Sequence, residues 1–127
     1  MDIYTVVRGM LEFVEEKGKL LDAGCGSGYF LRLMQELDFD VYGFDLSRVA
    51  VDFAREVYGL RNVVACSWEE LPADWRSFSF ITAIEVVEHL DKPLEFVSKM
   101  RSLLFPGGAL IISVPNRERL GKIVCIR

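Results

Sequence analysis

The stretch LLDAGCGSGYF, residues 20–30, is the part of the sequence that most strongly predicts the fold. A short apolar run, Lys19–Ala23, leads directly into three glycines at alternate positions, and a helical pattern, Tyr29–Leu37, follows them. Apolar runs of this length that end at turn residues are typical of buried strands. Glycines at such a turn let the backbone bend sharply and leave room for a ligand. The stretch therefore predicts a strand, a ligand-binding turn and a helix.

The same alternation of strands and helices continues along the chain. Apolar runs predict strands at Asp40–Phe44, Asn62–Cys66, Phe78–Val86 and Ala109–Val114, and helical patterns predict helices from Ser47 to Tyr58 and from Pro93 to about Leu104. Residues 3–14 have helical apolar spacing, residues 68–76 suggest a loop or short helical turn, and the Pro-Gly-Gly at 106–108 should turn the chain into the last strand. This alternation predicts an α/β fold with a mainly parallel sheet covered on both faces, in the order 3-2-1-4-5.

Length and composition set limits on the class of protein. A chain of 127 residues that is 51% hydrophobic fits one folded domain, residues 1–127. The net charge of −4 gives no general attraction to nucleic acid, and no apolar run approaches the roughly 20 residues that cross a membrane. The charged N-terminus does not resemble a secretion signal. Three cysteines without zinc spacing predict no metal site and suit a reducing cytoplasm.

Three features fall at the predicted carboxyl ends of strands, where open parallel sheets bind their ligands. The glycine turn precedes a helix whose positive end suits a carboxylate or phosphate. Asp45 ends the second strand, where a carboxylate can accept hydrogen bonds from both hydroxyls of a ribose. Ser67 and Trp68 follow the third strand and could meet an adenine. Together they predict a ligand with an anionic end, a ribose and an adenine.

The spacing of the glycines separates the candidate ligands. The dinucleotide fingerprint is G-x-G-x-x-G, which suits a pyrophosphate at the helix. Here the glycines are Gly24, Gly26 and Gly28, so the third glycine of that fingerprint is out of place. A nucleotide-binding oxidoreductase domain is therefore the weakest of the candidate functions.

Several motifs in order resemble those of class I S-adenosylmethionine-dependent methyltransferases. The segment at residues 20–28 resembles their first motif, and Gly43–Ser47 resembles their second. EVVEHL at residues 85–90 and LFPGGALIISVPN at residues 104–116 resemble the subgroup of ubiquinone-biosynthesis O-methyltransferases. The resemblance implies a Rossmann-like three-layer sandwich and S-adenosylmethionine as cofactor. Members of the family usually continue past the fifth strand, so it also implies a sheet that lacks their last two strands.

The resemblance assigns roles to individual positions. It implies that Asp22 and the backbone of Gly24, Cys25 and Gly26 contact the methionine part of the cofactor. It places the ribose on Asp45, the adenine against Leu46, Ser67 and Trp68, and Glu85 beside the cofactor. No catalytic residue is predicted, because an activated methyl donor needs mainly alignment and exclusion of water. His89, the single histidine, is either a general base or a loop histidine bonded to backbone.

Two functions and two arrangements of the last strand stay open. The favoured function is an enzyme that transfers a methyl group to a small-molecule acceptor, and the alternative is a non-catalytic S-adenosylmethionine-binding module. An uncovered fifth strand would expose unpaired backbone groups. The tail Lys122–Ile126 could cover it after a long connection, Pro115–Gly121, or a second chain or partner subunit could pair there and form a dimer.

Overall fold

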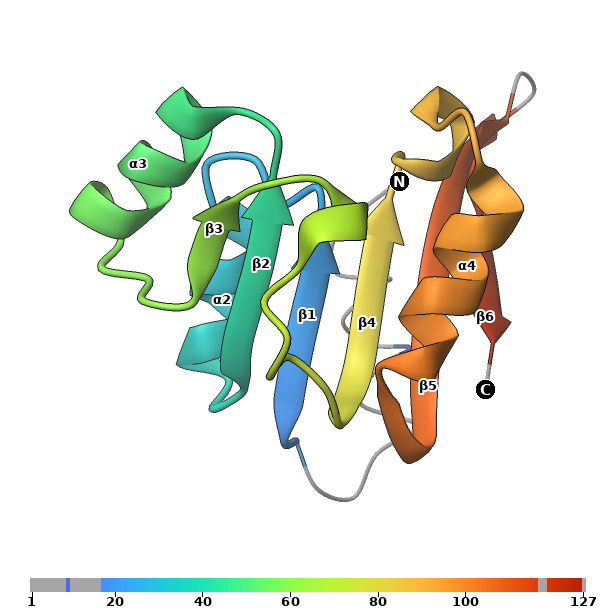
Figure 1. Cartoon of the computed structure of the whole chain (residues 1–127), viewed down its shortest axis with the longest axis horizontal. Coiled ribbons are helices and arrows are strands. Elements are labelled where there is room, and N and C mark those ends of the chain that lie inside the picture. Colours follow the sequence, from blue (N-terminus) through green and yellow to red (C-terminus); the bar gives the residue numbers. More distant parts are fainter. Residues whose placement is uncertain (1–8, 10–16, 117–118, 127) are drawn as a thin grey trace.

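The computed structural model describes residue 9, residues 17–116 and residues 119–126. Its sheet has the strand order β3-β2-β1-β4-β5-β6 (Figure 1). The strands are β1 (Lys19–Ala23), β2 (Asp40–Asp45), β3 (Val63–Ala65), β4 (Phe78–Ile84), β5 (Leu104–Asn116) and β6 (Arg119–Ile126). The first five strands are parallel neighbours in the predicted order 3-2-1-4-5, so this prediction is confirmed. The N-terminal helix predicted at residues 3–14 lies, apart from Gly9, outside the described residues.

Helices lie on both faces of the sheet and form the outer layers. The helices are α2 (Tyr29–Glu36), α3 (Arg48–Val57) and α4 (Pro93–Ser102), with two short 3₁₀ turns, η1 (Trp68–Glu70) and η2 (Val87–His89). Ser47 caps α3 as predicted, because its hydroxyl accepts a hydrogen bond from the backbone N–H of Ala50 at 3.1 Å. In Figure 1, α4 lies in front of the sheet and α2 behind it.

The core consists of two apolar clusters, one on each face of the sheet. Neighbouring residues of a strand point to opposite faces, so Leu20 packs toward α2 while Leu21 packs toward α4. Phe80 and Ile81 divide in the same way on β4, and all four side chains are fully buried. Each such side chain contributes about 1.5–3 kcal/mol on burial. The strand ends that carry the site therefore rest on a packed base.

The start of β5 differs from the prediction. The Pro-Gly-Gly segment was expected to turn the chain before a strand at Ala109–Val114, but β5 already begins at Leu104, which pairs with Phe78. The register then shifts, and Ala109 pairs with Phe80. A Cβ on Gly108 would lie 2.8 Å from the carbonyl oxygen of Phe78, so this glycine lets β5 pass close to β4. The segment is an irregularity within the strand and not a turn before it.

The tail of the chain forms a sixth strand. β6 pairs antiparallel with β5, with Leu110 opposite Ile126 and Ile112 opposite Val124. This confirms the prediction that the tail covers β5. The pairing reaches Asn116 and Arg119, so the predicted long connection at Pro115–Gly121 is wrong and the hairpin is tighter. The β5 edge proposed for a dimer is thus covered within the chain. In the part of the chain that is described, no helix is both long and apolar enough to span a membrane.

Candidate functional site

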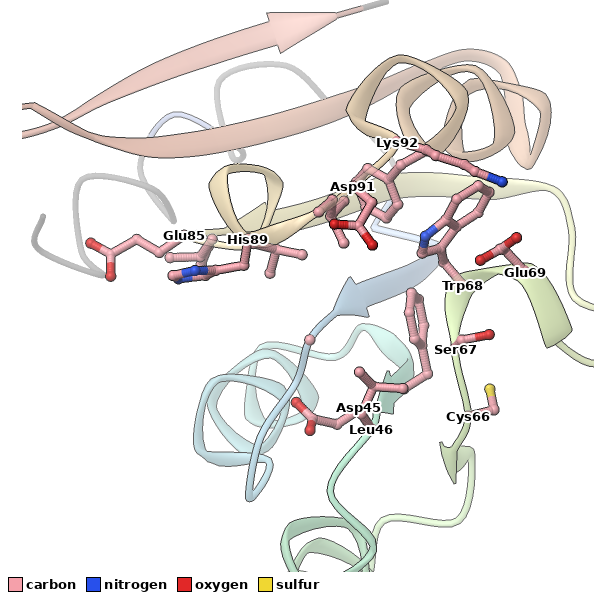
Figure 2. Close-up of a pocket in the computed structure, with 16 residues that line it drawn as sticks. Asp45, Leu46, Cys66, Ser67, Trp68, Glu69, Glu85, His89, Asp91 and Lys92 are labelled. Atoms are coloured by element: carbon pink, nitrogen blue, oxygen red, sulfur yellow. The ribbon is translucent and has the colours of Figure 1, made fainter.

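A cavity of about 710 Å³ opens at the carboxyl ends of β1 to β4 (Figure 2). This is the edge at which the strand order reverses between β1 and β4, as expected for a ligand site in this type of sheet. Six residues predicted from the sequence line the cavity: Gly24, Asp45, Leu46, Ser67, Trp68 and Glu85. The predicted residues Asp22, Cys25 and Gly26 do not line it: Asp22 is buried near the end of β1, and Cys25 and Gly26 belong to the glycine turn itself.

The glycine turn is tied to the end of β2 by its backbone. The N–H groups of Gly24 and Cys25 both donate to the carbonyl oxygen of Phe44, at 2.9 and 3.0 Å. The N–H of Gly28 donates to the carbonyl of Cys25 at 3.1 Å and closes the turn before α2. These bonds hold the backbone of the turn beside the cavity in one conformation.

Two glycines of the turn cannot be replaced without strain. Gly28 has φ +89°, and a Cβ there would lie 2.8 Å from Leu60 and 2.9 Å from the Cβ of Ala54. Gly24 has φ +72°, and a Cβ there would lie 2.7 Å from a methyl group of Val86. Both φ values lie in the left-handed region that favours glycine. The turn therefore packs closely against α3 on one side and against the segment after β4 on the other.

The carboxylate of Asp45 connects the glycine turn to the start of α3. Its Oδ2 accepts from the N–H of Gly26 and its Oδ1 accepts from the N–H of Ser47, both at 2.9 Å. Its own carbonyl accepts from the N–H of Cys66 at 3.1 Å, which ties in the segment after β3. A carboxylate oxygen has two acceptor sites, so each oxygen retains capacity for another donor. The side chain is thus preoriented at the cavity wall.

Asp22 lies below the turn and is almost fully buried, with 4% of its surface exposed. The Thr82 hydroxyl on β4 donates to its Oδ1 at 2.8 Å. Burial raises the pKa of this carboxyl to about 7, the Thr82 hydrogen bond opposes that shift, and the negative charge of Asp45 adds to it. Burial likewise raises the pKa of the neighbouring Cys25 thiol, which keeps it protonated. Asp22 is therefore mostly protonated below neutral pH.

One part of the cavity wall is apolar and aromatic. The Trp68 ring packs edge-to-face on the ring of Phe96, with centroids 5.9 Å apart, and Phe96 itself is fully buried in α4. Leu46 follows β2 and is 80% exposed, which is unusual for a leucine that lines a cavity. Aromatic and aliphatic side chains supported in this way offer flat surfaces to a planar ring. The wall therefore suits an adenine-like group.

Another part of the wall is the connection from β4 to α4. It contributes Glu85, His89, Asp91 and Lys92, and in Figure 2 Glu85 and His89 lie together on the side away from Trp68. Glu85 has φ +56°, and its N–H donates to the carbonyl of Ser113 on β5 at 2.9 Å. The Nε2 atom of His89 lies 3.6 Å from a carboxylate oxygen of Glu88. His89 therefore lies at the cavity, which is where a general base would have to lie.

Sequence reasoning missed several residues of the wall. They are Phe44, Glu69, Ile84, Val86, Leu90, Asp91, Lys92 and Phe96. Most belong to strand ends or to the segment just before Pro93, so the rule that ligands bind beyond the carboxyl ends of strands could have indicated them. Phe96 gives no such signal, because its position on α4 marks it as a core residue. Within the described ranges, no group of three or more possible metal ligands occurs.

Comparison with known proteins identifies related sequences. The family described as Methyltransferase domain matches residues 4–122. The ubiquinone biosynthesis O-methyltransferase of Cereibacter sphaeroides is 39% identical over 107 residues, which are 79% of this chain and 42% of that protein. The same enzyme of Paraburkholderia phymatum is 34% identical over 106 residues, or 79% and 45% of the two chains. The chain thus spans less than half the length of these curated relatives.

Solved structures share the fold. The PH0226 protein of Pyrococcus horikoshii has a TM-score of 0.78 and 26% identity, over 93% of this chain and 55% of that one. The plantazolicin methyltransferase BpumL in complex with SAH has a TM-score of 0.80 and 19% identity, over 91% and 46%. An amino pentose methyltransferase of Micromonospora echinaspora, solved with S-adenosylmethionine bound, has a TM-score of 0.78 and 24% identity. The alignment covers 92% of this chain and 51% of that one. Each of the three alignments covers more than nine-tenths of this chain.

Proposed function

This chain belongs to the methyltransferase-domain family, and from that premise we propose that it binds S-adenosylmethionine and transfers its methyl group to a small-molecule acceptor. One observation carries the proposal above the others. The glycine turn, the Asp45 carboxylate and the Trp68 wall converge on one cavity from the ends of three strands. Each of these groups matches a different part of the same ligand.

The parts of the cofactor can be assigned to the parts of the wall. The Asp45 carboxylate has free acceptor capacity for the ribose hydroxyls. The backbone of Gly24, Cys25 and Gly26, with Asp22 below it, would hold the methionine part near the start of α2. The adenine would lie between Leu46 and the Ser67–Trp68 segment, and Glu85 would lie beside the cofactor. The close packing of Gly24 and Gly28 supports this assignment, because a Cβ at either position would displace the turn.

The charge of the wall also suits this cofactor. The described lining residues include four carboxylates, Asp45, Glu69, Glu85 and Asp91, and one cationic side chain, Lys92. S-adenosylmethionine carries a sulfonium, an ammonium and a carboxylate, so its methionine end has a net positive charge. Carboxylates around a partly enclosed cavity attract such a group more strongly than they would in open water. A pyrophosphate would be repelled by the same wall.

The cofactor supplies an activated methyl group when it is bound. The protein's part is then to fix the donor, to align an acceptor and to exclude water. His89 lines the cavity, where it could accept a proton from a hydroxyl acceptor.

A reducing compartment such as the cytoplasm fits Cys25 and Cys66, which are both free thiols. Both apolar clusters pack against the same sheet, one on each face, and this supports treating residues 1–127 as a single domain.

Calorimetric titration tests cofactor binding directly. We expect S-adenosylmethionine to bind with about −7 to −8 kcal/mol, a micromolar Kd, and NAD to show no binding. Asp45→Ala should weaken binding by roughly 1.5–3 kcal/mol, because charge-assisted hydrogen bonds are lost. Asp40→Ala, at the exposed opposite end of β2, is the matched control and should leave affinity unchanged. Preferential binding of NAD, or unchanged affinity in Asp45→Ala, would contradict the proposal.

A second measurement separates an enzyme from a binding module. Incubation with labelled S-adenosylmethionine and a panel of hydroxylated and amine-bearing small molecules should transfer label to one acceptor class. If the cofactor binds but no label moves to any acceptor, the non-catalytic module becomes the better description. The result does not depend on the calorimetric test, because binding and transfer are read separately.

A further inference from the structure

Asp22 is a buried carboxyl placed below the proposed methionine site, and the proposed function assigns it no change of protonation. It lies at the end of β1, directly before the glycine turn, and its side chain is hydrogen-bonded to Thr82. A buried carboxylate normally has a cationic partner or several donors. Among the described residues no lysine, arginine or histidine is ion-paired with Asp22. A single neutral hydroxyl is a weak substitute for a counterion.

Apart from the Thr82 hydroxyl, which donates one hydrogen bond, the groups that face Asp22 disfavour a negative charge there. Asp45, at the end of β2, is itself an anion, and its charge raises the pKa of Asp22. Cys25 in the turn stays a neutral thiol, and Thr82 on β4 is neutral. The side chains of α2 that pack on this face, Phe30, Leu31 and Met34, are apolar. The pKa of about 7 follows from these surroundings, so the carboxyl is largely protonated below neutrality.

A cationic ligand in the cavity would change this balance. Gly24 lies only two residues after Asp22 and lines the cavity, so the positively charged end of a ligand at the turn lies close to the carboxyl. A unit charge at short range in a partly desolvated site favours ionisation of a neighbouring acid, and does so less where water screens it. That is enough to lower a pKa near neutrality.

We propose that Asp22 is a proton-coupled positioning residue, protonated in the empty site and ionised when the cationic end of S-adenosylmethionine is seated above it. The inference rests on the proposed function. On binding, the carboxyl O–H bond breaks and its proton goes to solvent. Methyl transfer removes the positive charge from the sulfur, so Asp22 then takes a proton back from solvent. The residue thereby favours the charged donor over the neutral-sulfur product, S-adenosylhomocysteine, and assists product release.

Proton release is the direct test. Titration calorimetry in two buffers of different ionisation enthalpy, at pH 6, should show release of up to about one proton when S-adenosylmethionine binds, and fewer for S-adenosylhomocysteine. At pH 8.5 release should vanish, because Asp22 is then already ionised. The ratio of the two affinities should rise several-fold from pH 5.5 to 7.5 in the unmodified protein. A flat ratio with no buffer dependence would overturn the inference.

Variants identify the group that releases the proton. Asp22→Asn should abolish the release and flatten the affinity ratio, while Asp40→Asn should retain both. If Asp22→Asn fails to fold, difference infrared spectroscopy of the unmodified protein serves instead. Addition of S-adenosylmethionine at pH 6 should bleach the C=O stretch of one protonated carboxyl, and an unchanged band would contradict the inference. Failure of the unmodified protein to bind would count against the proposed function, whereas binding without proton release counts against Asp22 alone.

Discussion

The two walls of the cavity are built in different ways. The wall formed by the glycine turn and Asp45 is held by hydrogen bonds between residues far apart in the sequence, such as Gly26 with Asp45 and Gly24 with Phe44. The β4–α4 connection is held mainly by local bonds, such as the N–H of His89 to the carbonyl of Val86. Its side chains at Glu85, His89 and Asp91 are exposed. We infer that the first wall is preorganised for the invariant cofactor and the second can adapt to an acceptor.

The largest expected effect tests how tightly the glycine turn is packed. Gly28→Ala should lower the free energy of unfolding by about 2–4 kcal/mol, because it combines a left-handed φ with contact against Leu60 and Ala54. Gly59→Ala is the matched control, since Gly59 has φ +67° but open space around its Cβ position. In the Gly59→Ala variant the free energy of unfolding should fall by only about 1–2 kcal/mol. Equal losses in urea denaturation would show that packing at the turn contributes nothing.

The second prediction concerns how the free energy of unfolding depends on pH. We expect this dependence to come mainly from Asp22, directly before the glycine turn. The pKa of Asp22 is about 7 in the folded protein and near 3.8 in an unfolded chain, so the folded state binds the proton more tightly. The stabilisation of the folded state that this pKa difference provides is complete below about pH 3.8 and is lost as pH rises toward 7. We expect the unfolding free energy to fall by roughly 2–3 kcal/mol from pH 5 to pH 8.

Thermal or urea denaturation across this pH range checks the prediction. Asp22→Asn should remove most of the slope, because an amide does not titrate. The control, Asp52→Asn on the exposed side of α3, should keep the slope of the unmodified protein. A stability that rises from pH 5 to pH 8 would contradict the burial of a protonated Asp22.

The smallest effect is expected on the β4–α4 wall. Glu85 has a positive φ, so Glu85→Gly relieves backbone strain but also gives the unfolded chain more freedom, and the two terms nearly offset. The unfolding free energy should change by less than about 0.5 kcal/mol. Affinity for S-adenosylmethionine should fall by about 0.2–1 kcal/mol, as for an exposed ion pair. A loss as large as that for Asp45→Ala would mean that both walls are equally preorganised.

The sequence predicted the wall formed by the glycine turn and Asp45 better than it predicted the β4–α4 connection. The glycine spacing, Asp45 and the strand order follow from local patterns, and the structure brings Gly24, Asp45 and Ser67 to one cavity. Phe96 was missed because its place in the wall depends on how α4 packs across the sheet. The start of β5 was misjudged for a similar reason. Whether a Pro-Gly-Gly segment turns the chain depends on the neighbouring strand, and here Leu104 pairs with Phe78 before it.

The protonation state of Asp22 also could not be predicted from the sequence. An acidic residue before a glycine turn suggests a direct contact with ligand, but β1 is a central strand and its side chains lie under both layers of helices. The hydrogen bond from Thr82 joins residues 60 positions apart in the sequence. Long-range packing of this kind sets the protonation state of the residue, and no local pattern reports it.

We propose that the cofactor occupies the cavity between the glycine turn and the β4–α4 connection. Backbone amide chemical shifts, followed while S-adenosylhomocysteine is added to the labelled protein, report where it binds. We expect large shifts at residues 24–28, 45–47 and 66–68, smaller ones at 85–92, and none at the opposite strand ends around Asp40 and Phe78. Saturable shifts confined to those opposite ends or to the outer face of α3 would contradict it.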